Sequence, residues 1–430
     1  MSAPHDIPTD PAPSLGEATR LWWRIGLLSF GGPAAQIALM HKEVVEDRNW
    51  LSERQFLNAL SFCMLLPGPE AMQLATYAGW RLHGTIGGLI AGLLFIGPGA
   101  AVIMALAAIY SVFGAVPLVE ALFYGIKAAV LVIVVEALLR VSRKALTGMR
   151  HWIIAVAAFI GIFLLTIPYP LIVVLAGLYG AITATARPGQ GAVDMTRVSP
   201  RRTAGTILLW SGVWLLPLLA LSVSGAPGLL VQLGTFFSTL AVVTFGGAYA
   251  VLAYMAQDAV VQFGWLSAGE MIDALGLAET TPGPLILVTQ FVGFVAGFRE
   301  GGFGLAVIAA FVTLWVTFAP CFLWIFAGAP YIEWISHQPR LQGALEAITA
   351  AVVGVILNLS VWFALHVLFA TVTRERWGAV TLWRPELATI EWGAVLLFGV
   401  SCVLAFGLRW GILRILLVSA LLGAALGLLA

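Results

Sequence analysis

Long apolar stretches separated by short polar segments run through almost the whole chain. An α-helix needs about 20 apolar residues to cross the roughly 30 Å hydrocarbon core of a bilayer, and most of these stretches are about that long. They do not alternate between apolar and polar residues, as the strands of a membrane barrel do. We therefore predict an all-α polytopic membrane protein with about thirteen transmembrane segments, at 18–40, 55–80, 84–112, 116–139, 151–166, 169–186, 205–224, 228–254, 269–297, 302–328, 341–371, 390–407 and 410–429.

The composition supports lipid as the solvent of this chain. Hydrophobic residues make up 60% of it and charged residues 10%, whereas a soluble domain carries about 25% charged residues. The net charge of +1 gives no reason to expect a nucleic-acid partner. The sequence contains no phosphate-binding loop, no metal-ligand spacing of histidines and no nucleophile elbow, and its three cysteines are interpreted as small buried residues. We therefore expect neither an enzyme nor an ATP-driven pump, and no cofactor.

The two halves of the chain repeat each other. Three signatures of the first half recur 215 residues later, namely Phe30-Gly31-Gly32 as Phe245-Gly246-Gly247, Trp50-Leu51 as Trp265-Leu266, and Pro67-Gly68-Pro69 as Pro282-Gly283-Pro284. After an insertion the shift becomes 222, at which Ile126–Val130 corresponds to Ile348–Val352. We predict a disordered tail (1–15), a first repeat (16–186), a linker with an extra transmembrane helix (187–227) and a second repeat (228–430).

The relative orientation of the repeats depends on how many segments cross. If all of them cross, seven segments separate equivalent positions and the copies are inverted, with Lys and Arg divided about fourteen inside to seven outside. If the two Pro-Gly-Pro segments are re-entrant, the copies are parallel and the division is about sixteen to four. Charge counting therefore slightly opposes inversion, although inverted repeats around a site at the midplane are typical of secondary transporters.

Each Pro-Gly-Pro motif lies in the middle of an apolar segment, where a regular helix cannot continue. Proline removes an amide donor and clashes with the preceding turn, so two half-helices are expected, the second beginning at the second proline. The N-terminus of a half-helix presents unpaired N–H groups and a partial positive charge, which suits an anion. The Phe-Gly-Gly motifs are a second matched pair of breaks, which either allow close helix packing or line the same cavity.

The predicted anion site is built around these four breaks. Uncharged hydrogen-bonding side chains lie close to them in the sequence and would bind an oxyanion without a fixed charge. The candidate substrate-binding residues are Phe30, Gly31, Gly32, Pro33, Gln36, Pro67, Gly68, Pro69, Gln73, Lys127, Phe245, Gly246, Gly247, Thr280, Thr281, Pro282, Gly283, Pro284 and Gln290.

Charged residues inside apolar segments are costly and often functional. Lys127 lies about ten residues from either end of its segment and is expected to face the anion. Glu70 follows the first Pro-Gly-Pro and Glu279 precedes the second, so each either stabilises a helix end or couples transport to protons. Glu136 is expected to pair with Arg140 one turn later. The stretch 41–56 is expected to lie at the membrane interface.

The chain resembles the chromate ion transporter family in its long, two-domain form. The resemblance rests on FGGPAAQIALMHKEVV and WLSERQFLNALSFCMLLPGPEAMQLATYAGW in the first half, and on TFGGAYAVLAYM and GWLSAGEMIDALGLAETTPGPLILVTQFVGF in the second. It implies a bacterial inner-membrane protein that exports chromate and confers chromate resistance, with halves of opposite orientation. The residues that match the family pattern are those of the four breaks together with Gln36, Gln73, Gly79, Lys127 and Gln290.

Two functions are compatible with these residues. The first is a secondary transporter that exports chromate, driven by the membrane potential, by a proton gradient or by both. The second is a carrier of the same architecture for sulfate or another anion. Lipid is a partner in either case, and the sequence leaves open whether the chain forms a homodimer.

Overall fold

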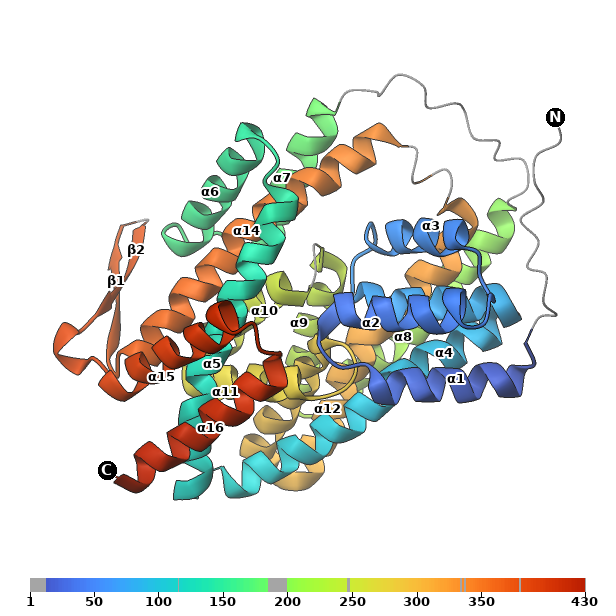
Figure 1. Ribbon diagram of the computed structural model, residues 1–430. Coiled ribbons are helices and arrows are strands. Elements are labelled where there is room, and N and C mark those ends of the chain that lie inside the picture. The colour runs from blue at the N-terminus through green and yellow to red at the C-terminus, as the bar shows by residue number, and fades with distance from the viewer. Residues whose placement is uncertain are drawn as a thin grey trace.

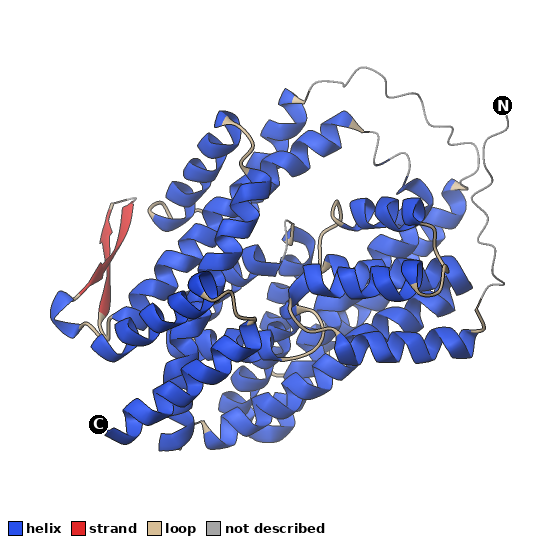
Figure 2. Ribbon diagram, in the orientation of Figure 1, coloured by secondary structure: helices blue, strands red, loops and turns tan. Residues whose placement is uncertain are grey.

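The computed structural model describes residues 13–114, 116–184, 199–245, 248–332, 335, 338–378 and 380–429. Helices make up nearly all of them, and a small β-hairpin lies at one edge (Figure 2). The helices of the first half are α1 (Leu15–Leu28), α2 (Gly32–His41), α3 (Glu53–Cys63), α4 (Glu70–Phe113), α5 (Pro117–Ala145), α6 (Met149–Phe163) and α7 (Tyr169–Thr183).

The second half repeats this order after one additional helix, α8 (Pro200–Val223). Its helices are α9 (Gly228–Val243), α10 (Ala248–Gln257), α11 (Ala268–Thr280), α12 (Val288–Gly328), α14 (Pro339–Leu368), α15 (Trp392–Cys402) and α16 (Ile412–Leu429). A π-helical turn follows α2 (Lys42–Glu46) and its counterpart α10 (Asp258–Gln262), and a 3-10 turn (Leu285–Leu287) precedes α12. Within the described part of the chain, five helical stretches are long and apolar enough to cross a membrane, at 70–113, 117–145, 200–223, 285–331 and 339–368. The chain is therefore an all-α polytopic membrane protein with an internal repeat.

Helices α4 and α12 each fold back on themselves. Within α4 the backbone leaves the helical region at His83 and Gly84, where Gly84 has a φ of 62°, and α12 does the same at Gly301 and Gly302. A Cβ atom added to Gly79 would lie 2.3 Å from the carbonyl oxygen of Gly87, although residues eight apart in a straight helix are about 12 Å apart. Each helix is therefore an antiparallel pair, as the predicted boundaries at 80–84 and 297–302 require.

Helices α1 and α2 form a hairpin and do not make one crossing. The guanidinium of Arg24 lies 3.5 Å from the carboxylate of Glu43, whereas a continuous helix would separate the two residues by more than about 25 Å. Figure 1 shows α1 and α2 running side by side at one end of the molecule. In the second repeat, Phe236 of α9 contacts Trp265, at a ring distance of 5.5 Å. The predicted crossings at 18–40 and 228–254 are therefore wrong, because the Phe-Gly-Gly breaks reverse the chain.

The Pro-Gly-Pro segments are hairpins as well. Nη1 of Arg299, near the end of the first part of α12, donates to the carbonyl oxygen of Trp265 at 2.8 Å, and its guanidinium pairs with Glu270 near the start of α11. In the first repeat, His41 contacts Glu53 at 2.6 Å and His83 contacts the carbonyl oxygen of Pro13 at 2.8 Å. Both ends of the α3–α4 hairpin therefore lie at one face of the protein.

We call the end of the molecule that holds Pro13, Glu53 and His83 face 1, and the end that holds Val116, Trp265 and Arg299 face 2. From face 1 the second part of α4 (85–113) crosses to face 2, and α5 returns. The α6–α7 pair runs out and back, and α8 then crosses once more. The second repeat therefore begins at face 2 and is inverted. From the sequence, re-entrant Pro-Gly-Pro segments implied parallel repeats. The repeats are inverted nevertheless, because the Phe-Gly-Gly segments are re-entrant too and the number of crossings between equivalent positions stays odd.

The helices group into two bundles (Figure 1). One contains α1, α4, α8, α9 and α12, and the other contains α5, α6, α7, α14, α15 and α16. Helices α10 and α11 bridge them, because α10 packs on α14 and α11 packs on α5. The largely apolar core therefore continues from one bundle to the other through the second repeat.

Several local features differ from the predicted ones or add to them. Helix α1 begins at Leu15, inside the predicted tail, because Ser14 and Glu17 form a capping box. The stretch 41–56, expected at the membrane interface, comprises the end of α2, a π-helical turn, a loop and the start of α3. Helix α8 begins at Pro200, five residues before the predicted segment 205–224. The antiparallel strands β1 (Val372–Trp377) and β2 (Val380–Pro385) were not predicted.

Candidate functional site

The four breaks in the helices meet at the centre of the protein. The backbone N–H of Gly283 donates to the carbonyl oxygen of Ser29 at 2.8 Å, and the N–H of Gly68 donates to the carbonyl oxygen of Thr244 at 2.9 Å. Ser29 corresponds to Thr244 and Gly68 to Gly283 at the shift of 215 residues. Each Pro-Gly-Pro break of one repeat is therefore bonded to the Phe-Gly-Gly break of the other, by two hydrogen bonds that repeat the internal symmetry.

Glycine is required at these breaks by both conformation and space. Gly31, Gly68 and Gly283 have φ values of 86°, 116° and 88°, which side chains rarely adopt. A Cβ atom at Gly68 would lie 2.8 Å from Nε2 of Gln73 and 3.0 Å from the sulfur of Cys321. The breaks are therefore closely packed turns.

The breaks direct the N-terminal ends of half-helices toward the centre. Helix α2 begins at Gly32 and α4 at Glu70, directly after the first repeat's breaks, and α10 and the 3-10 turn before α12 begin after those of the second. Pro69 and Pro284 are N-caps, so each half-helix begins one residue later than predicted. The first N–H groups of a helix have no partner inside it, and its N-terminus carries about half a positive charge. Four such ends converge on the same region.

The predicted side-chain donors bond to the backbone around the breaks. Nε2 of Gln36 donates to the carbonyl oxygen of Gly283 at 2.7 Å, and Nε2 of Gln73 donates to that of Pro67 at 2.6 Å. The hydroxyls of Thr280 and Thr281 donate to carbonyl oxygens of α11. The Oε1 atoms of three buried glutamines have no hydrogen-bond partner within the described part of the chain, namely Gln36, Gln73 and Gln290. In this conformation the side-chain amides of Gln36 and Gln73 therefore stabilise the backbone of the breaks.

The two repeats differ in how deeply their breaks are buried. The whole stretch 281–290 is buried, whereas 67–70 is half-buried and Phe30 is exposed. Phe245 is half-buried, and the predicted site residues Gly246 and Gly247 lie outside the described residues. Glu279 is buried and accepts a hydrogen bond from the Tyr249 hydroxyl at 2.6 Å. The predicted pair of Glu136 and Arg140 is confirmed, at 2.6 Å.

Lys127 lies away from the breaks, beside a carboxylate that the sequence analysis missed. Its Nζ is 3.5 Å from Oδ2 of Asp273, which also accepts a hydrogen bond from the Tyr110 hydroxyl at 2.8 Å. Asp273 is buried and precedes Thr280 by two turns of α11, about 10 Å. A charged residue inside the predicted segment 269–297 was the signal that could have identified it.

These three residues line a cavity of about 540 Å³ that opens near face 2. Its other charged residues are Glu120, Glu270 and Arg299, and Arg299 pairs with Glu270. Acidic groups thus outnumber basic ones, so the cavity as a whole does not attract anions. The charge of Lys127 is balanced by Asp273 in this conformation.

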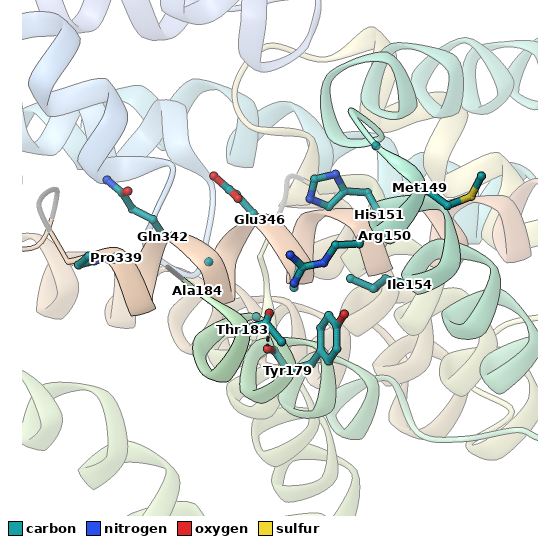
Figure 3. Close-up of a pocket in the computed structure, with 14 residues that line it drawn as sticks. Met149, Arg150, His151, Ile154, Tyr179, Thr183, Ala184, Pro339, Gln342 and Glu346 are labelled. Atoms are coloured by element: carbon teal, nitrogen blue, oxygen red, sulfur yellow. Dashed lines mark hydrogen bonds between the residues drawn. The ribbon is translucent and has the colours of Figure 1, made fainter. Parts of the chain in front are cut away.

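A second cavity, of about 350 Å³, lies between α6, α7 and the start of α14 (Figure 3). Arg150, His151 and Glu346 point toward its interior from opposite walls. The guanidinium of Arg150 also lies over the ring of Tyr179, 5.8 Å from its centroid. None of the predicted site residues lines this cavity, which is at face 1 and remote from the breaks.

Comparison with known proteins gives the family. The sequence signature of the chromate transporter family matches residues 17–181 and 231–428. The chain is 31% identical to a probable chromate transport protein of Synechococcus elongatus, over 80% of this chain and 84% of that one. It is 31% identical to a chromate transport protein of Pseudomonas aeruginosa, over 84% and 82% of the two chains. No solved structure matches it significantly. The chain therefore belongs to the chromate transporter family.

Proposed function

We propose that the protein exports chromate from the cytoplasm across the bacterial inner membrane and thereby confers chromate resistance. The observation that carries the proposal is the convergence of four half-helix N-termini on one central region. Backbone N–H groups and helix dipoles bind a tetrahedral dianion without a fixed positive charge, so the anion can also leave. Discontinuous helices whose N-termini point at an anionic group near the midplane are a known arrangement in inverted-repeat transporters.

The distribution of charge supports face 1 as the cytoplasmic face. Positively charged residues are enriched on the cytoplasmic side of membrane proteins. Among the described residues, those at face 2 and its β-hairpin are Arg299, Arg374, Arg376 and Arg384. Those at face 1 include Lys42, Arg48, Arg54, Arg81, Arg140, Arg143, Lys144, Arg150, Arg201, Arg202 and Arg340. This division of eleven to four is stronger than the fourteen to seven of the fully crossing arrangement and weaker than the sixteen to four of the arrangement with re-entrant Pro-Gly-Pro segments alone.

The membrane potential is sufficient to drive this export. Moving one charge through 100 mV changes its free energy by about 2.3 kcal/mol, so a dianion gains roughly 4–5 kcal/mol on leaving a negative cytoplasm. That free energy supports a concentration ratio on the order of a thousandfold. Glu70 and Glu279 are the proposed groups for any additional coupling to protons, because both stand next to a Pro-Gly-Pro break.

The test is uptake of radioactive chromate into inverted membrane vesicles that contain the protein. With an inside-positive potential, we expect accumulation that disappears when the potential is collapsed and in the Pro67→Ala/Pro69→Ala variant. The matched proline control is Pro200→Ala, at the exposed start of α8. This control should accumulate chromate as the unchanged protein does, because Pro200 lies outside the breaks.

The same vesicles separate the alternative substrates and driving forces. Sulfate is added as competitor and then as the labelled substrate, and a pH gradient is imposed without a potential. Accumulation of sulfate but not of chromate would contradict chromate as the substrate and leave an anion carrier of the same architecture. Accumulation driven by the pH gradient alone, and lost in Glu70→Gln or Glu279→Gln, would support proton coupling.

A further inference from the structure

The inverted repeats are not in equivalent positions relative to the bundle of α5, α7, α14 and α16. In the second repeat α10 packs on α14, and α11 packs on α5, α14 and α16. The counterparts of α10 and α11 in the first repeat are α2 and α3, and the helices they would pack on by symmetry are α5, α14 and α7. Within the described chain, α2 and α3 make few or no contacts with these helices. The pair α10 and α11 is thus packed against the bundle at face 2, whereas the equivalent pair α2 and α3 is separated from it at face 1.

Individual side chains show the same asymmetry. A Cβ atom at Gly276 of α11 would lie 2.5 Å from the side chain of Ile126 on α5, so the two helices touch. The counterpart of Gly276 in the first repeat is Ser61 of α3, which is exposed. Likewise Tyr249 and Glu279 are bonded to each other, whereas their counterparts Ala34 and Met64 are both exposed.

The contact that ties α11 to α5 includes the pair of Asp273 and Lys127. The carboxylate of Asp273 bonds to Lys127 and to Tyr110, and its other oxygen, Oδ1, is buried without a hydrogen-bond partner among the described residues. The side chain of Asp273 is 4% exposed and that of Lys127 is 28% exposed. A buried carboxylate that loses such a partner is strongly destabilised, so this pair favours the closed arrangement at face 2.

The internal repeat assigns a counterpart to each member of the pair. Asp273 corresponds to Asn58 on α3 at the shift of 215, and Lys127 corresponds to Thr349 on α14 at the shift of 222. Asn58 is exposed and Thr349 is half-buried, with its hydroxyl donating to the carbonyl oxygen of Leu345 at 2.7 Å. An amide and a hydroxyl can bond to each other without any charge. They stand apart here because α3 does not pack on α14.

We propose that Lys127 and Asp273 are gate residues that hold face 2 closed, and that Asn58 and Thr349 meet in the opposite conformation to hold face 1 closed. The transporter then alternates by exchanging the arrangements of its two repeats around the central breaks. The two gates differ in chemistry, since an ion pair closes face 2 and a neutral pair closes face 1. A gate has a role only if the proposed transport function holds, and in this respect the inference rests on that function. The approach of Asn58 to Thr349 can be tested without any substrate.

The test is thiol cross-linking in a background in which Cys63, Cys321 and Cys402 are replaced by serine. The variant Asn58→Cys/Thr349→Cys is treated in membranes with a short bis-thiosulfonate reagent, which forms a disulfide with each thiol and releases a sulfinate. We expect an intramolecular cross-link, seen as a shift in electrophoretic mobility that a reducing agent reverses. The matched control is Asn58→Cys/Leu357→Cys, because Leu357 is exposed on α14 about 12 Å further along the helix, and it should remain uncross-linked.

Each outcome has a distinct meaning. A cross-link at 58–349 that abolishes chromate transport reversibly would support the gate. Equal cross-linking of the control pair, or none at 58–349 in a protein that still transports chromate, would overturn it. A specific cross-link in a protein that transports no chromate would support the gate and contradict the proposed substrate. If the cysteine variant does not fold, Lys127→Thr/Asp273→Asn gives the second test, because the proposal predicts that this neutral pair transports better than either single change.

Discussion

Replacement of Asp273 by Asn tests the gate at face 2 most directly. Asparagine keeps the size of the side chain and an oxygen that can accept the hydrogen bond from Tyr110, but it removes the charge opposite Lys127. Breaking a buried ion pair by removing one partner costs about 3–5 kcal/mol. The ammonium that remains is partly exposed and can be hydrated, so we expect a cost at or just below the lower end of this range, about 2–3 kcal/mol.

That free energy changes the balance between the two conformations. The cost falls on the conformation closed at face 2, because only there does Lys127 contact Asp273, so its population relative to the other conformation should fall by about 30–150-fold. Chromate transport in vesicles should fall with it. The assay compares Asp273→Asn, Lys127→Thr and the double variant, which together form a double-mutant cycle.

The double variant decides the question. It reproduces the neutral residues found at the equivalent positions 58 and 349. It leaves no buried unpaired charge and should recover most of the transport lost in the single variants. Equal impairment of the single and double variants, with normal expression and thermal stability, would refute the argument. It would instead indicate that Lys127 or Asp273 acts directly on the anion.

Two further predictions concern the breaks. Gln36→Leu removes the amide that bonds to Gly283 and should lower the free energy of unfolding by about 1–3 kcal/mol. Thermal unfolding in detergent measures this change. The control Gln262→Leu, at an exposed position, should have little effect. Gly68→Ala should abolish chromate transport, because φ at Gly68 is 116° and a Cβ atom would meet Gln73 at 2.8 Å; Gly97→Ala, where a Cβ meets nothing within 4 Å, should keep most of it. Full transport by Gly68→Ala would contradict the requirement for glycine at the break.

The sequence by itself determined the class, the repeat and the positions of the breaks. Hydrophobicity and length require helices in lipid, because only helices and closed barrels satisfy every backbone polar group there. Pro67-Gly68-Pro69 and its counterpart exclude a regular helix through local sterics alone, so these breaks could be identified without tertiary information. The pairing of Glu136 with Arg140 was equally predictable, since one helical turn brings them together.

Only the tertiary structure decided where the chain goes after each break. A broken helix can continue across the membrane or turn back, and local propensities do not distinguish the two. Long-range contacts do, such as those of Arg24 with Glu43 and of Arg299 with Trp265. The partner of Lys127 was hidden for the same reason, because Asp273 lies 146 residues away in the chain. The packing of α11 against α5 brings Lys127 and Asp273 together, and α3 and α14 do not pack in the equivalent way. The contact therefore depends on which of two arrangements the repeats adopt.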